Sequence, residues 1–324
     1  MLQSLPVPPV FLWSLFLVIA LLVLVQAADW FTEAAERIGL AFGLPSFVVG
    51  VTIVAIGTSL PEVVASVLAV LEGASEIVAG NVVGSNIANL MLVLGIGAIL
   101  TGRLCVHYDL NVVDLPFLVG SAFFLAIILL NGSVGRIEAV MCLFGVCVYM
   151  HYALTNRHVP VLAEPDELPE PPAGKVGLAR TLAVLFGAGL LIYLGAEGTI
   201  WSVIELAAIA GIGREVIAAS AVAVGTSLPE VVVTVSAARR DRAELAVGNL
   251  LGSNVFNAFA VIGISAMIGE LYVPESIINF ALPLMIVGTL LTVFIMMRRE
   301  MTAWEGWLML MFYAYFLTSL FQPM

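Results

Sequence analysis

Long runs of apolar residues, separated by short polar stretches, extend along the whole chain. Each run is about as long as the ~20 residues that a helix needs to cross the hydrocarbon of a bilayer, or somewhat longer. A transmembrane β-barrel would show short alternating segments instead. The pattern therefore predicts an all-α polytopic membrane protein. Its ten predicted transmembrane helices cover residues 10–28, 39–70, 77–100, 112–131, 137–154, 179–206, 214–238, 244–268, 276–297 and 303–321.

Composition supports the membrane interpretation and excludes several function classes. Of the 324 residues, 61% are hydrophobic and 11% are charged, whereas a soluble domain carries roughly 25% charged residues. The net charge is −11, and the 12 Lys and Arg residues form no basic patch, which argues against a nucleic-acid partner. The composition indicates the lipid bilayer as partner, and nothing in it implies a protein partner or a cofactor. No paired Asp or Ser/His arrangement lies within the spans, so we expect no enzymatic activity.

The chain repeats itself with a shift of 168 residues. "GTSLPE" at Gly57–Glu62 recurs at Gly225–Glu230, and "GNVVGSNIAN" at 80–89 recurs as "GNLLGSNVFN" at 248–257. Each half holds five predicted spans, so the second must insert upside down, as in many secondary transporters. We therefore expect a first repeat at 1–154 with its motif at 55–89, a linker at 155–178, and a second, inverted repeat at 179–324 with its motif at 223–257. The first span is the partner of the sixth and should be retained rather than cleaved.

The Lys and Arg residues predict how the chain lies in the membrane. With the N-terminus outside, ten of the twelve basic residues fall on the cytoplasmic side, and only Arg136 and Arg214 lie outside. The linker is rich in proline and acidic residues, which is typical of a disordered segment. We expect a multi-pass protein of the cell membrane with both termini extracellular or periplasmic and the linker cytoplasmic.

The first repeated motif places a carboxylate inside the membrane, where insertion costs roughly 2.5–3.5 kcal/mol and usually serves function. Glu62 and Glu230 are the carboxylates in question. The proline before each glutamate should open its helix and free backbone carbonyls. Two hydroxyl residues lie within the same turn. The candidate ligands from this motif are Glu62, Thr58, Ser59 and the carbonyl of Ala55, and in the second half Glu230, Thr226, Ser227 and the carbonyl of Ala223.

The second repeated motif adds hydroxyls and amides. Ser85 and Asn89 are four residues apart and share a helix face, as do Ser253 and Asn257. Glycines at spacings of four should allow close helix approach. Together the two motifs form an oxygen-only cluster, which selects hard cations, and two carboxylates match one Ca²⁺ or more than one Na⁺. Because the empty carboxylates repel each other, competing cations or protons should occupy the site in turn, which gives exchange a mechanism.

The paired motifs resemble the two alpha repeats of the sodium/calcium exchangers, within the calcium/cation antiporter superfamily. The resemblance covers both halves and implies that Glu62 and Glu230 bind Ca²⁺ and Na⁺, with the residues named above completing the sites. It also implies that the first and sixth spans slide past the remaining bundle to alternate access. Potassium-dependent members commonly carry aspartate where this chain has Asn257, so the amide argues against potassium co-transport. The linker is too short for the calcium-sensing domains of animal exchangers, so we expect no such regulation.

Three alternatives remain beside sodium/calcium antiport. The same scaffold could couple calcium movement to protons, although proton-coupled relatives typically carry a "GNxxE" form in place of "GTSLPE". Potassium-dependent exchange is a second alternative. A passive cation channel is a third, and it is disfavoured because the repeats are inverted within one chain and the carboxylates lie at broken helices.

Overall fold

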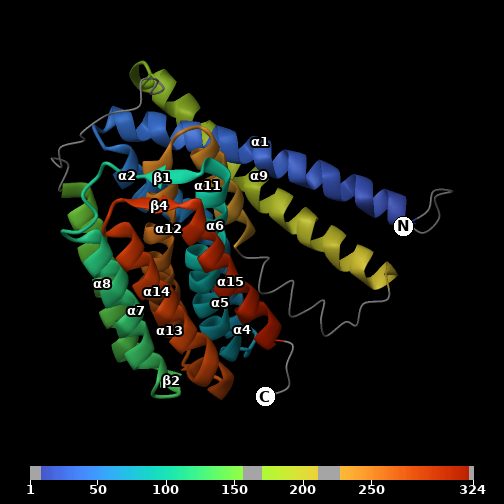
Figure 1. Ribbon diagram of the computed structural model, residues 1–324, viewed down its shortest axis with the longest axis vertical. Helices are drawn as coiled ribbons and strands as arrows, with labels where there is room; N and C mark the ends of the chain where they lie inside the picture. The colour runs from blue at the N-terminus through green and yellow to red at the C-terminus, as the bar shows by residue number, and fades with distance from the viewer. Residues whose placement is uncertain (1–8, 156–169, 211–226, 321–324) are drawn as a thin grey trace.

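The structure, a computed structural model, describes residues 9–155, 170–210 and 227–320, which form a bundle of helices with two small two-stranded sheets (Figure 1). Helices dominate because lipid offers no hydrogen bonds, so backbone groups must be satisfied within each segment. The first half contains α1 (Pro9–Ala41), α2 (Ser46–Val49), η2 (Gly50–Val54), α3 (Ala55–Thr58), α4 (Leu60–Leu71), α5 (Glu76–Ile87), η3 (Ala88–Val93), α6 (Leu94–Thr101), β1 (Arg103–Cys105), α7 (Asp114–Leu129), β2 (Ser133–Val134) and α8 (Arg136–Thr155).

The second half repeats this order of elements. It contains α9 (Gly174–Ile209), α11 (Leu228–Arg239), α12 (Ala243–Phe256), η4 (Asn257–Val261), α13 (Ile262–Ile268), β3 (Leu271–Tyr272), η5 (Ile277–Ala281), α14 (Leu282–Met296), β4 (Glu300–Thr302) and α15 (Ala303–Leu320). The η elements are π-helical turns within longer helices.

The predicted all-helical membrane fold is confirmed. Among the described residues, seven helical segments are long and apolar enough to cross a membrane. The shorter helix α7, the 18-residue α15 and the partly described span around α11 account for the other three predicted spans.

Two predicted span boundaries are wrong. The first span does not end at residue 28, because α1 continues to Ala41. Its charged residues Asp29 and Glu36 do not terminate the helix; they form ion pairs with Arg240 and Arg242. The second span begins at Ser46 rather than at 39, because Gly43 adopts a left-handed φ of 66°. The end of the predicted linker, residues 174–178, is already helical and belongs to α9.

The two sheets give direct evidence of the inverted repeat. β1 pairs with β4 and β2 pairs with β3, both antiparallel. The shift of 168 residues turns the pair Arg103–Thr302 into Leu271–Val134, which is a pair in the other sheet. Figure 1 shows β1 and β4 at one end of the bundle and β2 at the opposite end. Equivalent strands thus lie at opposite ends of the molecule, as two halves of opposite orientation require.

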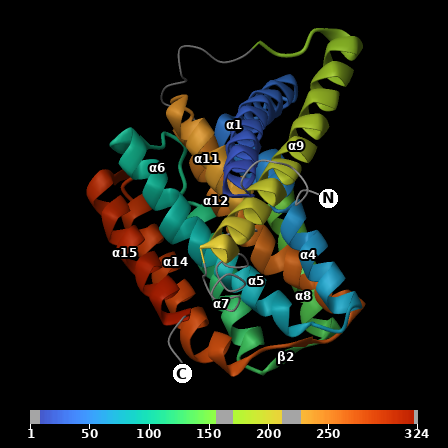
Figure 2. The same ribbon diagram turned by 90° about the vertical axis from the view of Figure 1, so that its right-hand side faces the viewer.

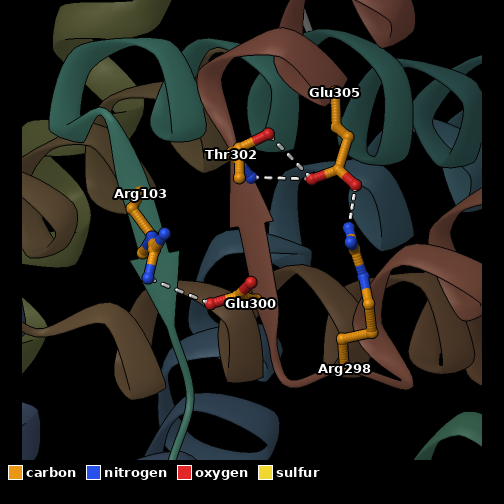
Figure 3. A network of polar contacts seen from close by, with 5 residues as sticks. All are labelled: Arg103, Arg298, Glu300, Thr302 and Glu305. Carbon is orange, nitrogen blue, oxygen red and sulfur yellow. Dashed lines mark hydrogen bonds and ion pairs between the residues drawn. The ribbon is translucent and has the colours of Figure 1, made fainter.

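The sheet of β1 and β4 carries a polar network that joins the two repeats (Figure 3). Arg103 of β1 lies 3.3 Å from Glu300 of β4, and Arg298 forms an ion pair with Glu305. The Glu305 carboxylate also accepts a 2.8 Å hydrogen bond from the Thr302 backbone N–H. At this end of the bundle, the basic side chains of Arg103 and Arg298 are therefore both paired with acidic side chains.

Helices α1 and α9 lie side by side, set at an angle to the other helices (Figures 1 and 2). α1 is held to α11 by polar contacts: Arg240 lies 2.7 Å from the Asp29 carboxylate, which also accepts a hydrogen bond from Ser236. α9 is separated from α4 by an apolar cavity of 560 Å³, to which α9 contributes Phe186 and Leu190. Polar contacts thus join α1 of the first repeat to the α11 region of the second.

Candidate cation-binding site

In both "GTSLPE" motifs the serine has the same backbone conformation directly before a helix begins. Ser59 has φ −87° and ψ 2°, between α3 and α4, and Ser227 has φ −87° and ψ 0° immediately before α11. In each case the proline lies in the first turn of the helix that follows, where its missing N–H costs no intrahelical hydrogen bond. The proline therefore lies where a helix begins, and the glutamate after it belongs to the first helical turn.

The prediction that this break frees the Ala55 carbonyl is wrong. That carbonyl accepts the Ser59 backbone N–H at 3.0 Å and lies 3.3 Å from the Thr58 hydroxyl. The reason is the spacing of helical hydrogen bonds. Pro61 has no N–H to donate to the carbonyl four residues earlier, and that carbonyl belongs to Gly57, two residues after Ala55. The Ala55 carbonyl can serve as a ligand only through its second lone pair.

Glu62 of the first repeat and Glu230 of the second are the two carboxylates of the site. Both side chains are completely buried, and their carboxylates lie close enough to repel each other. The Ser85 side chain faces Glu62. Neither Glu62 oxygen makes a hydrogen bond of ordinary geometry within the described part of the chain, and the same holds for one Glu230 oxygen. Buried carboxylate oxygens in this state need a positive charge to offset the cost of burial.

The hydroxyl residues of the first repeat contact the second repeat. Ser59 donates a 3.4 Å hydrogen bond to the Glu230 carboxylate, and the Thr58 hydroxyl lies 3.4 Å from that of Ser253. All three side chains are buried. The motifs of the two halves therefore build one polar cluster rather than two separate ones.

The remaining predicted site residues are also buried. Asn89 is the second residue of η3 and Asn257 is the first residue of η4, and both side chains are fully enclosed. Within the described ranges, none of their amide atoms has a hydrogen-bond partner, and neither does the Ser227 hydroxyl. Thr226 and Ala223 lie outside the described residues. Among the predicted residues that the structure describes, direct contacts join Thr58 to Ser253 and Ser59 to Glu230, whereas Asn89, Asn257 and Ser227 are buried without such a contact.

Close backbone contact places η2 and α3 against α12. A methyl group added to Gly248 would lie 2.5 Å from the Phe47 carbonyl, and one added to Gly252 would lie 2.6 Å from the Val51 Cα. These glycines therefore have the packing role that their spacing predicts. For Gly84, no atom of the described residues lies within 4 Å of such a methyl. The residues equivalent to Val51 and its neighbours lie at 218–223, outside the described ranges.

Two pairs of polar residues beside the site were missed from the sequence. Asn81 donates a 3.1 Å hydrogen bond to Ser66, and its equivalent Asn249 donates one of the same length to Thr234. Asn249 also accepts a 3.1 Å hydrogen bond from Thr58. The signal was available, because both asparagines follow a repeated glycine and recur under the shift. Their own hydrogen bonds reach partners 15 residues away, which spacing along one helix cannot reveal.

A further contact marks the axis between the repeats. Asn86 donates a 3.2 Å hydrogen bond to the backbone carbonyl of Asn254, and the shift of 168 residues relates these two positions. Two equivalent residues can touch only where the repeat axis passes between them. The carboxylate cluster therefore forms where the two inverted halves meet, which is where transporters of this architecture hold their substrates.

The donor set determines the chemistry. Carboxylate, hydroxyl and amide oxygens are hard ligands, which favour Ca²⁺, Na⁺ or Mg²⁺ over the softer transition metals. The unpartnered oxygens of Glu62, Glu230, Asn89 and Asn257 are acceptors that a cation would satisfy. The residues present therefore fit a hard cation as a transported substrate.

Comparison with known proteins gives the family. The sequence profile described as "Sodium/calcium exchanger protein" matches residues 12–156 and 180–322. The sodium/calcium exchanger MaX1 of Methanosarcina acetivorans is 34% identical over 95% of this chain and 98% of its own length. The inner membrane protein YrbG of Escherichia coli is 30% identical over 78% of both chains. A solved structure of the sodium-calcium exchanger NCX_Mj, soaked without Na⁺ and Ca²⁺, superimposes with a TM-score of 0.81 at 27% identity, over 96% of this chain and 99% of the other.

These matches confirm the resemblance that the paired motifs carry, and they extend it to both repeats. The chain is a multi-pass membrane protein with the fold of NCX_Mj, and it is a transporter rather than an enzyme. It belongs to the sodium/calcium exchanger family.

Proposed function

We propose that this protein exchanges Ca²⁺ for Na⁺ across the cell membrane by alternating access, with both ions competing for one site around Glu62 and Glu230. The observation that carries the proposal is the pairing of two fully buried carboxylates from opposite repeats. With a combined charge of −2, the pair is balanced by one Ca²⁺ or by more than one Na⁺. Competition for one set of oxygens couples the two fluxes.

The remaining ligands follow from the buried cluster. Thr58, Ser59, Ser85 and Asn89 would complete the site from the first repeat, and Ser227, Ser253 and Asn257 from the second. Their burial and the unpartnered amide atoms support this role. Ala55 would contribute through the second lone pair of its carbonyl. Thr226 and Ala223 enter the proposal by the internal repeat alone.

Alternating access would come from movement of the pair α1 and α9 relative to the bundle. In support, these are the longest helices of the described chain, at 33 and 36 residues, and they lie against each other at an angle to the other helices. An apolar cavity beside α9 leaves space for such a displacement. The proposed arrangement has repeats at 1–154 and 179–324, a cytoplasmic linker at 155–178, and both termini outside.

Gradient-driven flux tests the proposal and separates its alternatives. Purified protein in liposomes should accumulate Ca²⁺ against its own gradient when Na⁺ is concentrated inside, and a sodium ionophore should abolish the uptake. If a pH gradient alone drives Ca²⁺ uptake, the coupling ion is the proton and not Na⁺. A strict need for K⁺ would establish potassium-dependent exchange, and passive equilibration without uphill movement would indicate a channel.

A further inference from the structure

Asn249 joins three helices through a single amide group. It lies on α12, and its side chain is fully buried. Its Nδ2 donates a 3.1 Å hydrogen bond to the Thr234 hydroxyl on α11, while its Oδ1 accepts a 3.1 Å hydrogen bond from the Thr58 hydroxyl on α3. In the structure the Nδ2 end of the amide faces Thr234 on α11. The carbonyl end is therefore held toward Thr58.

The Thr58 hydroxyl has one proton and at least three candidate acceptors. They are Asn249 Oδ1 at 3.1 Å, the backbone carbonyl of Ala55 at 3.3 Å and, where Thr58 is the donor of that contact, the Ser253 hydroxyl at 3.4 Å. The contact with Asn249 is the shortest of the three. A hydroxyl coordinates a cation through its lone pairs, so its proton must point away from the ion. If the proton returned to Ala55, as membrane threonines commonly bond to their own helix, it would occupy a second candidate ligand as well. The position of this proton thus affects two oxygens of the site.

We propose that Asn249 is a positioning residue for cation binding. Its side-chain oxygen accepts the hydrogen bond from the Thr58 hydroxyl, and this keeps the oxygens of Thr58 and Ala55 available to the ion. Thr234 acts one step further out by holding the amide in the orientation that accepts. This inference rests on the proposed function, because it assumes that Thr58 is a ligand.

The first repeat supports the same arrangement independently. Asn81 donates a 3.1 Å hydrogen bond to Ser66, and these residues are the equivalents of Asn249 and Thr234. The Oδ1 of Asn81 is buried and has no hydrogen-bond partner in the described ranges. The Asn81 amide therefore has the same orientation as that of Asn249, with its Nδ2 toward the hydroxyl residue and its Oδ1 available as an acceptor.

The test compares transport kinetics of four variants in liposomes. Asn249→Leu removes the acceptor, Thr234→Val removes the group that holds it, and Thr234→Ser keeps that group in the form that Ser66 has in the other repeat. Thr289→Val is the matched control, because the buried Thr289 hydroxyl bonds to Met285 of its own helix. We expect Asn249→Leu to raise the half-saturating Ca²⁺ concentration about threefold to tenfold, the effect of one hydrogen bond. Thr234→Val should cause a smaller rise, and Thr234→Ser and Thr289→Val should stay near the wild-type value.

A residue that only supports the fold would instead lower the maximal rate with the amount of folded protein and leave the half-saturating concentration unchanged. That result would overturn the proposal. If Asn249→Leu cannot be purified as a folded protein, the pair Thr234→Val and Thr234→Ser decides by the same criterion.

A double-mutant cycle adds a second test. If Asn249 acts through Thr58, then Asn249→Leu should have little further effect once Thr58→Val has removed the hydroxyl. Independent, additive effects would contradict the proposal. Glu62→Gln, measured alongside, separates a failure of this inference from a failure of the proposed function. If Glu62→Gln is inactive and Asn249→Leu transports like the wild type, only the role of Asn249 is refuted. If Glu62→Gln transports normally, the proposed function is refuted as well.

Discussion

Ser59 of the first repeat donates a 3.4 Å hydrogen bond to the Glu230 carboxylate of the second. These residues are 171 positions apart in the chain, and both are fully buried. The contact shows that neither repeat builds its polar cluster alone. A change on either side should therefore affect the whole site, and the predictions below use this dependence.

Neutralising either central glutamate should abolish exchange. Glu62→Gln and Glu230→Gln keep the side-chain volume but remove one of the two charges that offset a divalent cation. We expect Ca²⁺ uptake driven by Na⁺ to fall to the level of empty liposomes for each variant, with normal membrane insertion. The exposed Glu275, in the helical turn just before η5, provides the control, Glu275→Gln, which should transport normally. Near-normal uptake by either central variant would remove that glutamate from the mechanism.

Adding a third carboxylate should change the ion profile. Asn257 is fully buried, so Asn257→Asp places a further negative charge inside the protein, and in the proposed site this charge adds to those of Glu62 and Glu230. We expect its Ca²⁺ transport to become sensitive to pH or to K⁺, because a proton or an extra cation must then balance the added charge. Transport would be measured over a range of pH with and without K⁺. Asn131→Asp, on an exposed loop, is the control. An unchanged ion profile for Asn257→Asp would mean that this amide lies outside the site.

The glycine contacts between η2 and α12 should be needed for stability. In Gly248→Ala the new methyl would lie 2.5 Å from a backbone oxygen, and backbone cannot move aside cheaply. Overpacking of this kind typically costs about 1–3 kcal/mol. We expect a lower midpoint of thermal unfolding in detergent. Gly120→Ala serves as the comparison, because no atom in the described part of the chain lies within 4 Å of its added methyl. Equal unfolding midpoints for the two variants would show that these helices can move apart without a loss of stability.

The ion pair between Asp29 and Arg240 should bias the position of α1. The two side chains are 24% and 44% exposed, so the pair is worth only about 0.2–1 kcal/mol, and Ser236 adds a hydrogen bond. Asp29→Asn should shift the equilibrium of α1 toward conformations in which it lies farther from α11. The shift should be about twofold to fivefold.

Labelling measures this shift. A cysteine introduced on α1 would be modified by a membrane-impermeant thiol reagent, and its labelling rate should change in Asp29→Asn. The control is Glu33→Gln, which breaks the pair with Arg37 inside α1 and cannot couple two helices. Identical labelling of the two variants would show that the pair with α11 has no part in positioning α1.

Much of the fold could be predicted from the sequence, because lipid restricts the chain to helices of nearly fixed length and the repeat sets their orientation. The burial of Glu62 and Glu230 also followed from their position within apolar runs. The full length of α1 did not, since Asp29 and Glu36 resemble the polar end of a span until their arginine partners on another helix are known. The strands β1 to β4 are two or three residues long and too short to leave a pattern.

The candidate site shows a similar division. Residues with charges, hydroxyls or amides in the repeated motifs were predicted as ligands, and the structure brings Thr58 into contact with Ser253 and Ser59 into contact with Glu230. The state of the Ala55 carbonyl was predicted wrongly, because the proline affects a carbonyl two residues away. The role of Asn249 depends on a contact with Thr58 across 191 residues, and no local pattern encodes such a distance.

The central claim is that Ca²⁺ and Na⁺ compete for one site to which both repeats contribute. Equilibrium binding of radioactive Ca²⁺ to the purified protein, titrated with Na⁺, tests it most directly. The account predicts that Na⁺ displaces Ca²⁺ competitively and with a Hill coefficient above one, and that Glu62→Gln and Glu230→Gln each lose Ca²⁺ binding. Wild-type Ca²⁺ affinity in either variant, or Ca²⁺ binding that Na⁺ does not displace, would contradict it.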